Sequence, residues 1–242
     1  MLKFKDNIHG FWIGDGLREL ELMSIKSFLY FGYCYHIWMY EQPKNLPDQV
    51  IFHDANTIVP HSIYEQWQLK PTWHINQSFA NYFRYELMYQ QGGWWADMDV
   101  ICMKPLPNVT YCFTSASGLK LRVENEKLGL VKNIVNTSFR VPEACPLLKY
   151  IIEEIRDDAL KGNYPDKFGQ WGTILLSKHI VEQNLLQHEI DLIGSDFRDV
   201  KRQYQDTTLK IPDDYLVHFY NSQGKEDPKP NSLYARLRDK YL

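Results

Sequence analysis

No apolar run in this chain of 242 residues approaches the roughly 20 residues that a helix needs to cross a bilayer. The opening residues, MLKFKDN, also lack the apolar stretch of a signal peptide. Charge of one sign is not in excess, because the net charge is −3, and the composition gives no case for nucleic acid as a partner. We therefore expect a cytoplasmic protein.

Cysteine is scarce and scattered. Cys34, Cys102, Cys112 and Cys145 form no C-x-x-C pair, which argues against a zinc ribbon or a disulfide scaffold and fits a reducing compartment. Internal repeats, low-complexity tracts and obvious linkers are also absent. Since 44% of the residues are hydrophobic and 14% are aromatic, the composition is that of a globular protein. We predict a single domain over residues 1–242.

The chain does contain an alternation of strand-like and helix-like segments. Periodicity predicts strands over residues 7–14, 35–41, 49–55, 94–103, 130–141 and 215–220. It predicts helices over residues 19–33, 78–91, 173–183 and 232–241, and a further helix that Pro146 opens. This order indicates an α/β fold with a mixed, mainly parallel central sheet flanked by helices, of the Rossmann-like kind.

The clearest helix is predicted over residues 78–91. Ser78 is the expected N-cap, and Phe79, Phe83 and Leu87 recur every fourth residue. Gly92 and Gly93 are expected to end the helix. The stretch "WWADMDVICM" then reads as a strand.

Asp97 and Asp99 in that strand are the strongest chemical signal. Side chains alternate faces in a strand, so we expect both carboxylates to lie on one face and Met98 to point to the other. Two carboxylates at that spacing repel each other unless a cation or hydrogen-bond donors lie between them. Mg²⁺ or Mn²⁺ binds such oxygens and keeps positions for phosphate, so a metal site is one interpretation and a solvated strand end is the other.

The surroundings of the aspartates carry a resemblance. The run "SFANYFRYELMYQQGGWWADMDV" is similar to the signature of family 32-type glycosyltransferases with the DXD sugar-binding motif. That family includes bacterial polysaccharide glycosyltransferases and is distantly related to the glucosylating domains of clostridial toxins. The resemblance implies a GT-A fold and transfer of a sugar from a nucleotide-sugar with retention of configuration. It also implies that residues 1–106 bind the donor and residues 107–242 face the acceptor.

Individual site residues follow from the same resemblance. "IHGFWIG" resembles the opening strand of the family, which gives Trp12 the role of stacking on the nucleotide base; burial in the core is the alternative. Arg84 matches the family arginine that holds the nucleotide-sugar, unless it forms only a surface salt bridge. Asn81 stands where the family usually has aspartate, and this departure leaves the donor sugar open.

Later segments match only in outline. "YLVHFYNSQG" resembles the closing segment of the family, and His218 is the candidate neighbour of the diphosphate or metal there; a histidine at a strand end is the alternative. Gln170-Trp171 replaces the Gly-Pro-containing loop of relatives.

Mn²⁺ or Mg²⁺ held by Asp97 and Asp99 is expected to act as a Lewis acid on the leaving diphosphate, with Arg84 as a further donor. We expect Asp99 to bind the metal directly and Asp97 to act one step removed. The implied donor is a UDP-sugar in preference to a GDP-sugar, carrying a hexose or N-acetylhexosamine. The implied acceptor is a glycan or lipid-linked saccharide of surface polysaccharide biosynthesis.

Two other classes of function stay open. Phosphatases of the haloacid dehalogenase type also carry D-x-D after an apolar strand, but on their first strand, and "GSDFRD" at residues 194–199 would be their later acidic motif. A non-catalytic protein that binds nucleotide-sugars is the second alternative. The basic C-terminal helix, "SLYARLRDKYL", either rests on an anionic membrane surface or packs on its own domain.

Overall fold

The central sheet mixes parallel and antiparallel strands. A computed structural model describes residues 5–70, 72, 74–121, 131–193, 199–220 and 227–242. In these segments the strands of the sheet are β1 (Lys5–Phe11), β2 (Tyr33–Met39), β3 (Ile51–Asp54), β4 (Gly93–Ala96), β6 (Cys112–Leu121), β7 (Val131–Val141) and β8 (Glu189–Ile193).

Their spatial order is β3-β2-β1-β4-β7-β6-β8. The pairs β3-β2, β2-β1, β1-β4 and β6-β8 are parallel, whereas β7 runs antiparallel to both β4 and β6. The predicted α/β class and the mixed, mainly parallel sheet are confirmed. A second, two-stranded sheet pairs β5 (Val100–Cys102) with β9 (Leu216–His218) in antiparallel fashion.

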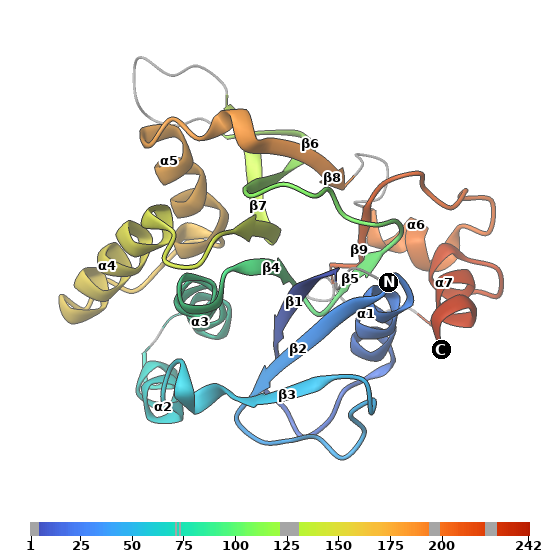
Figure 1. The fold of residues 1–242 in the computed structure, drawn as a ribbon, viewed down its shortest axis with the longest axis horizontal. Coiled ribbons are helices and arrows are strands. Elements are labelled where there is room, and N and C mark those ends of the chain that lie inside the picture. The colour runs from blue at the N-terminus through green and yellow to red at the C-terminus, as the bar shows by residue number, and fades with distance from the viewer. Residues whose placement is uncertain (1–4, 71, 73, 122–130, 194–198, 221–226) are drawn as a thin grey trace.

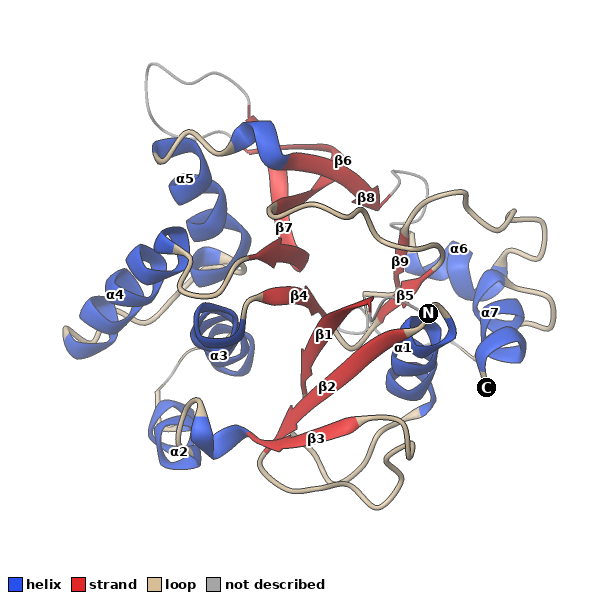
Figure 2. Ribbon diagram, in the orientation of Figure 1, coloured by secondary structure: helices blue, strands red, loops and turns tan. Residues whose placement is uncertain are grey.

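Helices pack on both sides of the sheet (Figures 1 and 2). They are α1 (Glu19–Tyr30), α2 (His61–Gln68), α3 (Ile75–Gln91), α4 (Pro146–Leu160), α5 (Leu175–Glu182), α6 (Val200–Gln205) and α7 (Leu233–Tyr241). One core cluster joins α3, α4 and α5 to the sheet, with Phe83 and Phe139 fully buried in it. Another joins α1 and α7 to β5 and β9, around Phe219.

Several predicted boundaries of helices and strands are wrong. Helix α3 begins at Ile75, so Ser78 is a buried residue within the helix and His74 takes the N-cap position. Burial of Ile75 against the core extends the helix beyond the favoured capping residue. At the other end, Gly92 does end α3, with φ of 60°. The predicted strand 7–14 ends at Phe11, so Trp12 follows the strand.

The largest correction concerns the predicted strand over residues 94–103. It is divided into β4 and β5, which belong to different sheets, and residues 97–99 form the break between them. The alternation of a regular strand therefore does not apply to Asp97 and Asp99, and they do not share a face for that reason. The contacts of the turn itself determine their positions.

Candidate active site

The candidate site lies where three strands end or begin. Trp12 follows β1 and Asp97 follows β4, and since these strands are parallel neighbours their carboxyl ends meet at one edge of the sheet. Ligands of open α/β sheets gather at this edge. Strand β9 brings His218 to the same place, because His218 is paired with Val100, the residue after Asp99.

The turn between β4 and β5 is fixed by backbone hydrogen bonds and by Met98. The Asp97 amide donates to the Thr137 carbonyl at 2.8 Å, and the Val100 amide donates to the Asp97 carbonyl at 3.1 Å. The Met98 side chain is buried and accepts a hydrogen bond from the Tyr35 hydroxyl at 3.3 Å. Met98 thus anchors the turn in the core, with one aspartate before it and one after it in the chain.

The Asp97 carboxylate is held by two donors. Its Oδ1 accepts from Arg84 Nη2 at 2.6 Å and from Trp95 Nε1 at 2.8 Å, while the Arg84 guanidinium lies 4.7 Å from the centre of the Trp95 ring. Burial raises the pKa of the Asp97 carboxyl, and the charge of Arg84 opposes that rise. Oδ1 is therefore engaged by the protein, and Oδ2 is the oxygen left for a ligand.

The carboxylate of Asp99 pairs with the imidazole of His218, the histidine predicted for the site from the sequence. The Asp99 Oδ1 atom lies 3.1 Å from His218 Nε2, and the Asp99 carbonyl accepts from the Phe219 amide at 2.9 Å. Burial alone would lower the pKa of His218, but the Asp99 carboxylate outweighs burial and raises it. One ligand atom from each of Asp97, Asp99 and His218 lies within 4.8 Å of the other two, so the described residues include a set suited to a metal ion.

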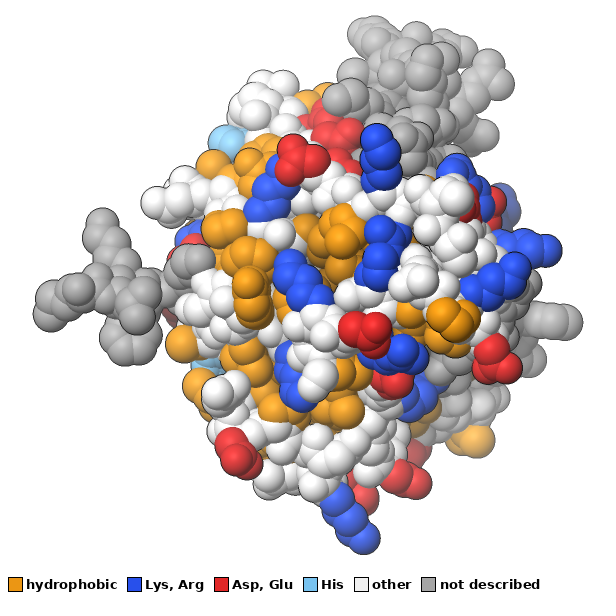
Figure 3. All heavy atoms as spheres, turned by 90° about the vertical axis from the view of Figure 1, so that its right-hand side faces the viewer, with side chains coloured by type: hydrophobic (Ala, Val, Ile, Leu, Met, Phe, Trp, Pro, Cys, Tyr) orange, Lys and Arg blue, Asp and Glu red, His pale blue; other side chains and the backbone are white. Residues whose placement is uncertain are grey.

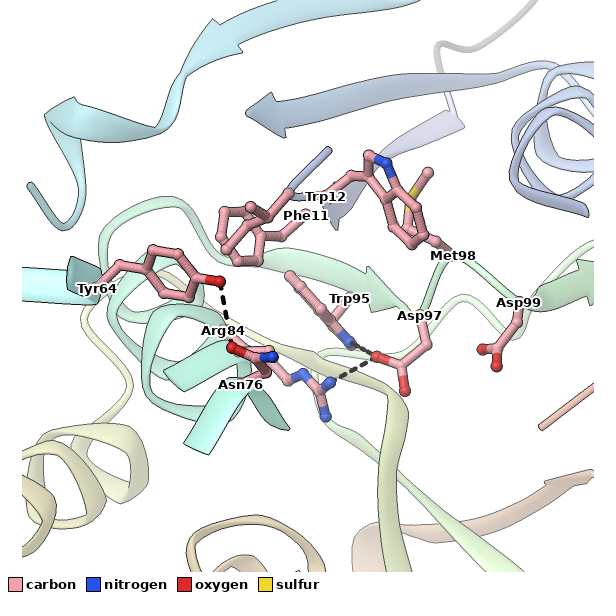
Figure 4. A pocket seen from close by; sticks show the side chains of 11 residues that line it. Phe11, Trp12, Tyr64, Asn76, Arg84, Trp95, Asp97, Met98 and Asp99 are labelled. Carbon is pink, nitrogen blue, oxygen red and sulfur yellow. Dashed lines mark hydrogen bonds and ion pairs between the residues drawn. The ribbon is translucent and has the colours of Figure 1, made fainter. Parts of the chain in front are cut away.

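A pocket of about 350 Å³ opens beside this cluster (Figure 4). Its lining combines aromatic, small, polar and charged residues. The lining residues are Phe11, Trp12, Ile13, Tyr64, Asn76, Ala80, Arg84, Trp95, Asp97, Met98 and Asp99. Of the residues predicted for the site, the pocket thus brings together Trp12, Arg84, Asp97 and Asp99.

Trp12 separates this pocket from a second one. Its indole Nε1 donates to the Gly16 carbonyl at 3.1 Å, and the Arg18 guanidinium lies over its ring at 4.8 Å. The second pocket, also of about 350 Å³, shares Trp12 and Ile13 and adds Asp15 and Glu41 to its lining. A tryptophan between two open pockets differs from a core residue and keeps the predicted stacking role available.

Asn81 lies behind the pocket. It is 4% exposed, and its Oδ1 accepts from Asn136 Nδ2 at 2.8 Å. The Asn136 carbonyl in turn accepts from Arg84 Nη1 at 2.5 Å. Asn81 and Arg84, one turn apart on α3, are thus joined through the same residue of β7. In this structure Asn81 contacts the support of Arg84, and its predicted contact with the donor stays a prediction.

The segment that contains Gln170 and Trp171 packs behind Arg84, against the residues that hold it. A Cβ atom at Gly172 would lie 2.7 Å from Asn81 Nδ2, and the Tyr85 hydroxyl donates to the Gly172 carbonyl at 3.1 Å. Trp171 is 2% exposed and belongs to the core. The loop therefore packs directly on the residues that hold Arg84.

Sequence patterns missed three residues near the site. Asn76 precedes Arg84 by eight residues, about two helical turns, so helical periodicity alone would place it on the same face. Arg18 follows Trp12 closely in the chain and was detectable as a basic residue near the opening strand. Asn136 carries no local signal, because it meets Arg84 only through tertiary packing.

The C-terminal helix packs on its own chain. Leu233, Leu237 and Tyr241 of α7 are buried, and the Tyr234 hydroxyl donates to Glu19 of α1 at 2.8 Å. Figure 3 shows the side of the molecule that carries α6 and α7, where Lys and Arg side chains are interspersed with hydrophobic and acidic ones. Among the described helices, none has the length and apolar character required to traverse a bilayer. Residues 194–198 of the acidic motif predicted at residues 194–199 lie outside the described residues, and Asp199 is the N-cap of α6.

Comparison with known proteins agrees with the resemblance. Residues 23–114 match the family model described as a glycosyltransferase sugar-binding region containing a DXD motif. No curated protein matches the chain. Among solved structures, the PaToxG glycosyltransferase has a TM-score of 0.55 at 14% identity, over 76% of this chain and 71% of that one. The ligand-free glycosyltransferase domain of the YGT toxin has a TM-score of 0.49 at 8% identity, over 80% and 82%.

Proposed function

We propose that this chain, which carries a glycosyltransferase sugar-binding region with a DXD motif on a GT-A-like fold, is a metal-dependent, retaining glycosyltransferase. Its donor is a UDP-sugar that carries a hexose or N-acetylhexosamine. Its acceptor is a glycan or lipid-linked saccharide of surface polysaccharide biosynthesis. The observation that supports the proposal most is the convergence of Asp97, Asp99 and His218 beside Arg84 at the end of one pocket.

The residues of the cluster fit a divalent cation. Carboxylate oxygens suit Mg²⁺ and Mn²⁺, and an imidazole beside them favours Mn²⁺ of the two. Asp99 and His218 are the residues that would hold the ion directly. Asp97, whose Oδ1 is engaged by Arg84 and Trp95, would act through its second oxygen. When bound, such an ion supplies Lewis-acid stabilisation of the leaving diphosphate.

The chain's own residues do the remaining work. Arg84 is fixed at three points, by Asp97, by the Asn136 carbonyl and by the Trp95 ring, so its donors are in place before a substrate arrives. Preorganised donors stabilise the charge that develops on a leaving group. Trp12 offers a planar surface to the base, and the buried Trp95 and Met98 help exclude water, which would otherwise hydrolyse the donor.

The alternatives fare less well on the same observations. A phosphatase of the haloacid dehalogenase type carries its motif on the first strand, whereas Asp97 follows the fourth strand of the chain. A non-catalytic nucleotide-sugar-binding protein would share the pocket but would not turn the donor over. A turnover assay with a panel of nucleotide-sugars separates that alternative from a transferase.

We place the enzyme in the cytoplasm, in peripheral contact with the inner face of the membrane. The support is the partly exposed Arg238 and the exposed Lys240 at the end of α7, beside Tyr30 of α1, which is 64% exposed. Cosedimentation with anionic vesicles tests this part, and equal recovery with neutral vesicles would contradict it.

The decisive experiment compares Asp99→Asn with Asp97→Asn, with Asp166→Asn as a control on an exposed residue. We expect Asp99→Asn to lower sugar transfer about a hundredfold or more, and excess Mn²⁺ to restore little of it. Asp97→Asn should also lose transfer but keep more of the Mn²⁺ dependence of nucleotide binding. Asp166→Asn should match wild type. Transfer at wild-type rates in both site variants would refute the metal site.

A further inference from the structure

The orientation of Asn76 in the pocket is fixed by helix α2. Its Oδ1 accepts from the Tyr64 hydroxyl at 3.2 Å and from Gln68 Nε2 at 2.7 Å. A carbonyl oxygen has two lone pairs, and both are engaged by these donors. The amide nitrogen is consequently turned away from α2, and Figure 4 shows it on the side of the pocket. Asn76 therefore presents N–H donors to whatever binds there.

The position of Asn76 relates it to the rest of the donor. Asn76, Ala80 and Arg84 succeed one another at intervals of four residues on α3, and all three line the pocket. Eight residues of helix span about 12 Å, so Asn76 lies roughly that far along α3 from Arg84. Ala80 leaves room between them. If the diphosphate lies beside Arg84 and Asp97, the ribose and then the base extend toward Asn76.

The part of the pocket around Asn76 suits a neutral, planar ligand group. The Arg84 guanidinium is bound to Asp97, which groups with Asp99 at the metal end, whereas Tyr64 donates to Asn76 (Figure 4). An aromatic, uncharged environment favours a base over a second phosphate. The amide of Asn76 is then the donor that can read the edge of that base.

We infer that Asn76 selects the base of the donor by donating its side-chain amide to a keto oxygen, as in uracil. This inference rests on the proposed function, because it takes the nucleotide-sugar to lie in this pocket. Uracil presents an acceptor at its 4-position, where cytosine presents an amino group. Two donors facing each other cannot form a hydrogen bond, so the Asn76 amide is left unpaired where it faces the 4-amino group of cytosine. Tyr64 and Gln68 prevent the amide from turning to offer its oxygen instead.

The test measures the affinity of UDP and CDP in the presence of Mn²⁺, since these ligands share the ribose and the diphosphate and differ only at positions 3 and 4 of the base. Wild type should prefer UDP by about tenfold or more, the worth of one hydrogen bond. Asn76→Asp replaces the donor with an acceptor of the same shape, and should lower the UDP-to-CDP ratio at least tenfold. Asn76→Leu removes the donor without adding charge and should bring the ratio close to one. Asn163→Asp adds the same charge on an exposed loop and should leave the ratio unchanged.

The ratio of the UDP and CDP affinities does not respond to changes that weaken the binding of both nucleotides equally. A new carboxylate repels the diphosphate of both ligands alike, so repulsion lowers both affinities without changing their ratio. Asn76 is exposed, and thermal melts should show that both variants stay folded. Equal affinity of wild type for UDP and CDP, with both lost in Asp99→Asn, would overturn the inference and leave the proposed function standing. Absence of binding by any nucleotide-sugar or nucleotide to wild type would overturn both.

Discussion

Three histidines on neighbouring strands should make the N-terminal half of the sheet sensitive to acid. His9 on β1 is 2% exposed, and its ring centre lies 5.1 Å from that of His36 on β2. His36 Nδ1 lies 2.8 Å from His53 Nε2 on β3. Burial, and then the neighbouring His36 and His53, lower the pKa of His9 from 6.5 to about 3. Burial also lowers the pKa values of His36 and His53.

The sign and size of the effect follow from these pKa values. Between pH 6.5 and about 3 the unfolded chain binds a proton at His9 that the folded chain does not bind. The contribution of neutral His9 to stability is therefore fully present above pH 6.5 and is lost as the pH falls toward 3. A pH of 5 lies about 1.5 units below the pKa of His9 in the unfolded chain. This difference corresponds to a loss of about 2 kcal/mol in the free energy of unfolding.

The assay is urea unfolding at pH 8 and pH 5 of wild type, His9→Gln and His61→Gln. Glutamine keeps an acceptor for the Trp38 indole, which donates to His9 Nδ1 at 3.2 Å, but it cannot gain a proton. We expect the loss of stability between the two pH values to be about 2 kcal/mol smaller in His9→Gln than in wild type. His61, whose side chain is 42% exposed, serves as the control for loss of a histidine outside this cluster. Equal losses in wild type and His9→Gln would refute the reasoning.

Three further substitutions test the support of the pocket. Trp12→Ala should weaken nucleotide binding about ten- to a hundredfold with little change in melting temperature, measured by titration calorimetry and thermal melts; normal binding with a large drop in melting temperature would assign Trp12 to the core. Gly172→Ala should lower the free energy of unfolding by about 1–3 kcal/mol in urea titrations, because its Cβ would lie 2.7 Å from Asn81 Nδ2, and unchanged stability would show that the contact gives way easily. Arg84→Ala should cost about 1–3 kcal/mol in the same titrations and abolish sugar transfer, because it removes a charged partner of Asp97; retained transfer would remove Arg84 from the mechanism.

Patterns in short segments of the sequence predicted the helices and helix ends that depend on interactions within those segments. Helix α3 was recognisable from Phe79, Phe83 and Leu87, and its end from Gly92, since spacing and backbone conformation are properties of short segments. Pro146 does open α4, and the C-terminal helix does follow Ser232, whose hydroxyl accepts from the Ala235 amide. The alternation of such segments was sufficient for the class of the fold.

The parts that escaped prediction depend on long-range contacts. The pairing of β5 with β9 joins residues more than a hundred positions apart, and it is this pairing that interrupts the predicted strand over residues 94–103. Short β8 carries too few residues for a period to emerge, and α2 has Trp67 as its one buried residue among those the structure describes. The resemblance supplied Arg84 and His218, but no pattern in the sequence indicated that Asn136 holds Arg84.

Gly92 explains how α3 can turn so sharply into the strand that leads to the aspartates. Its φ of 60° belongs to the left-handed region, and a Cβ atom there would lie 2.4 Å from the amide nitrogen of Glu143. A side chain at this position would therefore collide with the backbone of Pro142 and Glu143, which follow β7. The close approach of this segment to the junction of α3 and β4 depends on a residue that has no side chain.

The stretch from Trp95 to Asp99 then assigns one task to each side chain. Trp95 donates to Asp97 from within the core, so that carboxylate is fixed from the protein side and turned toward Arg84. Met98 is buried in a different core cluster from Trp95, which an unpaired polar residue at this position would not favour. Asp99 is thereby separated from Asp97 by a turn and reaches His218. Two carboxylates of different environment result from one short sequence, since Asp97 is paired with Arg84 and Asp99 with His218.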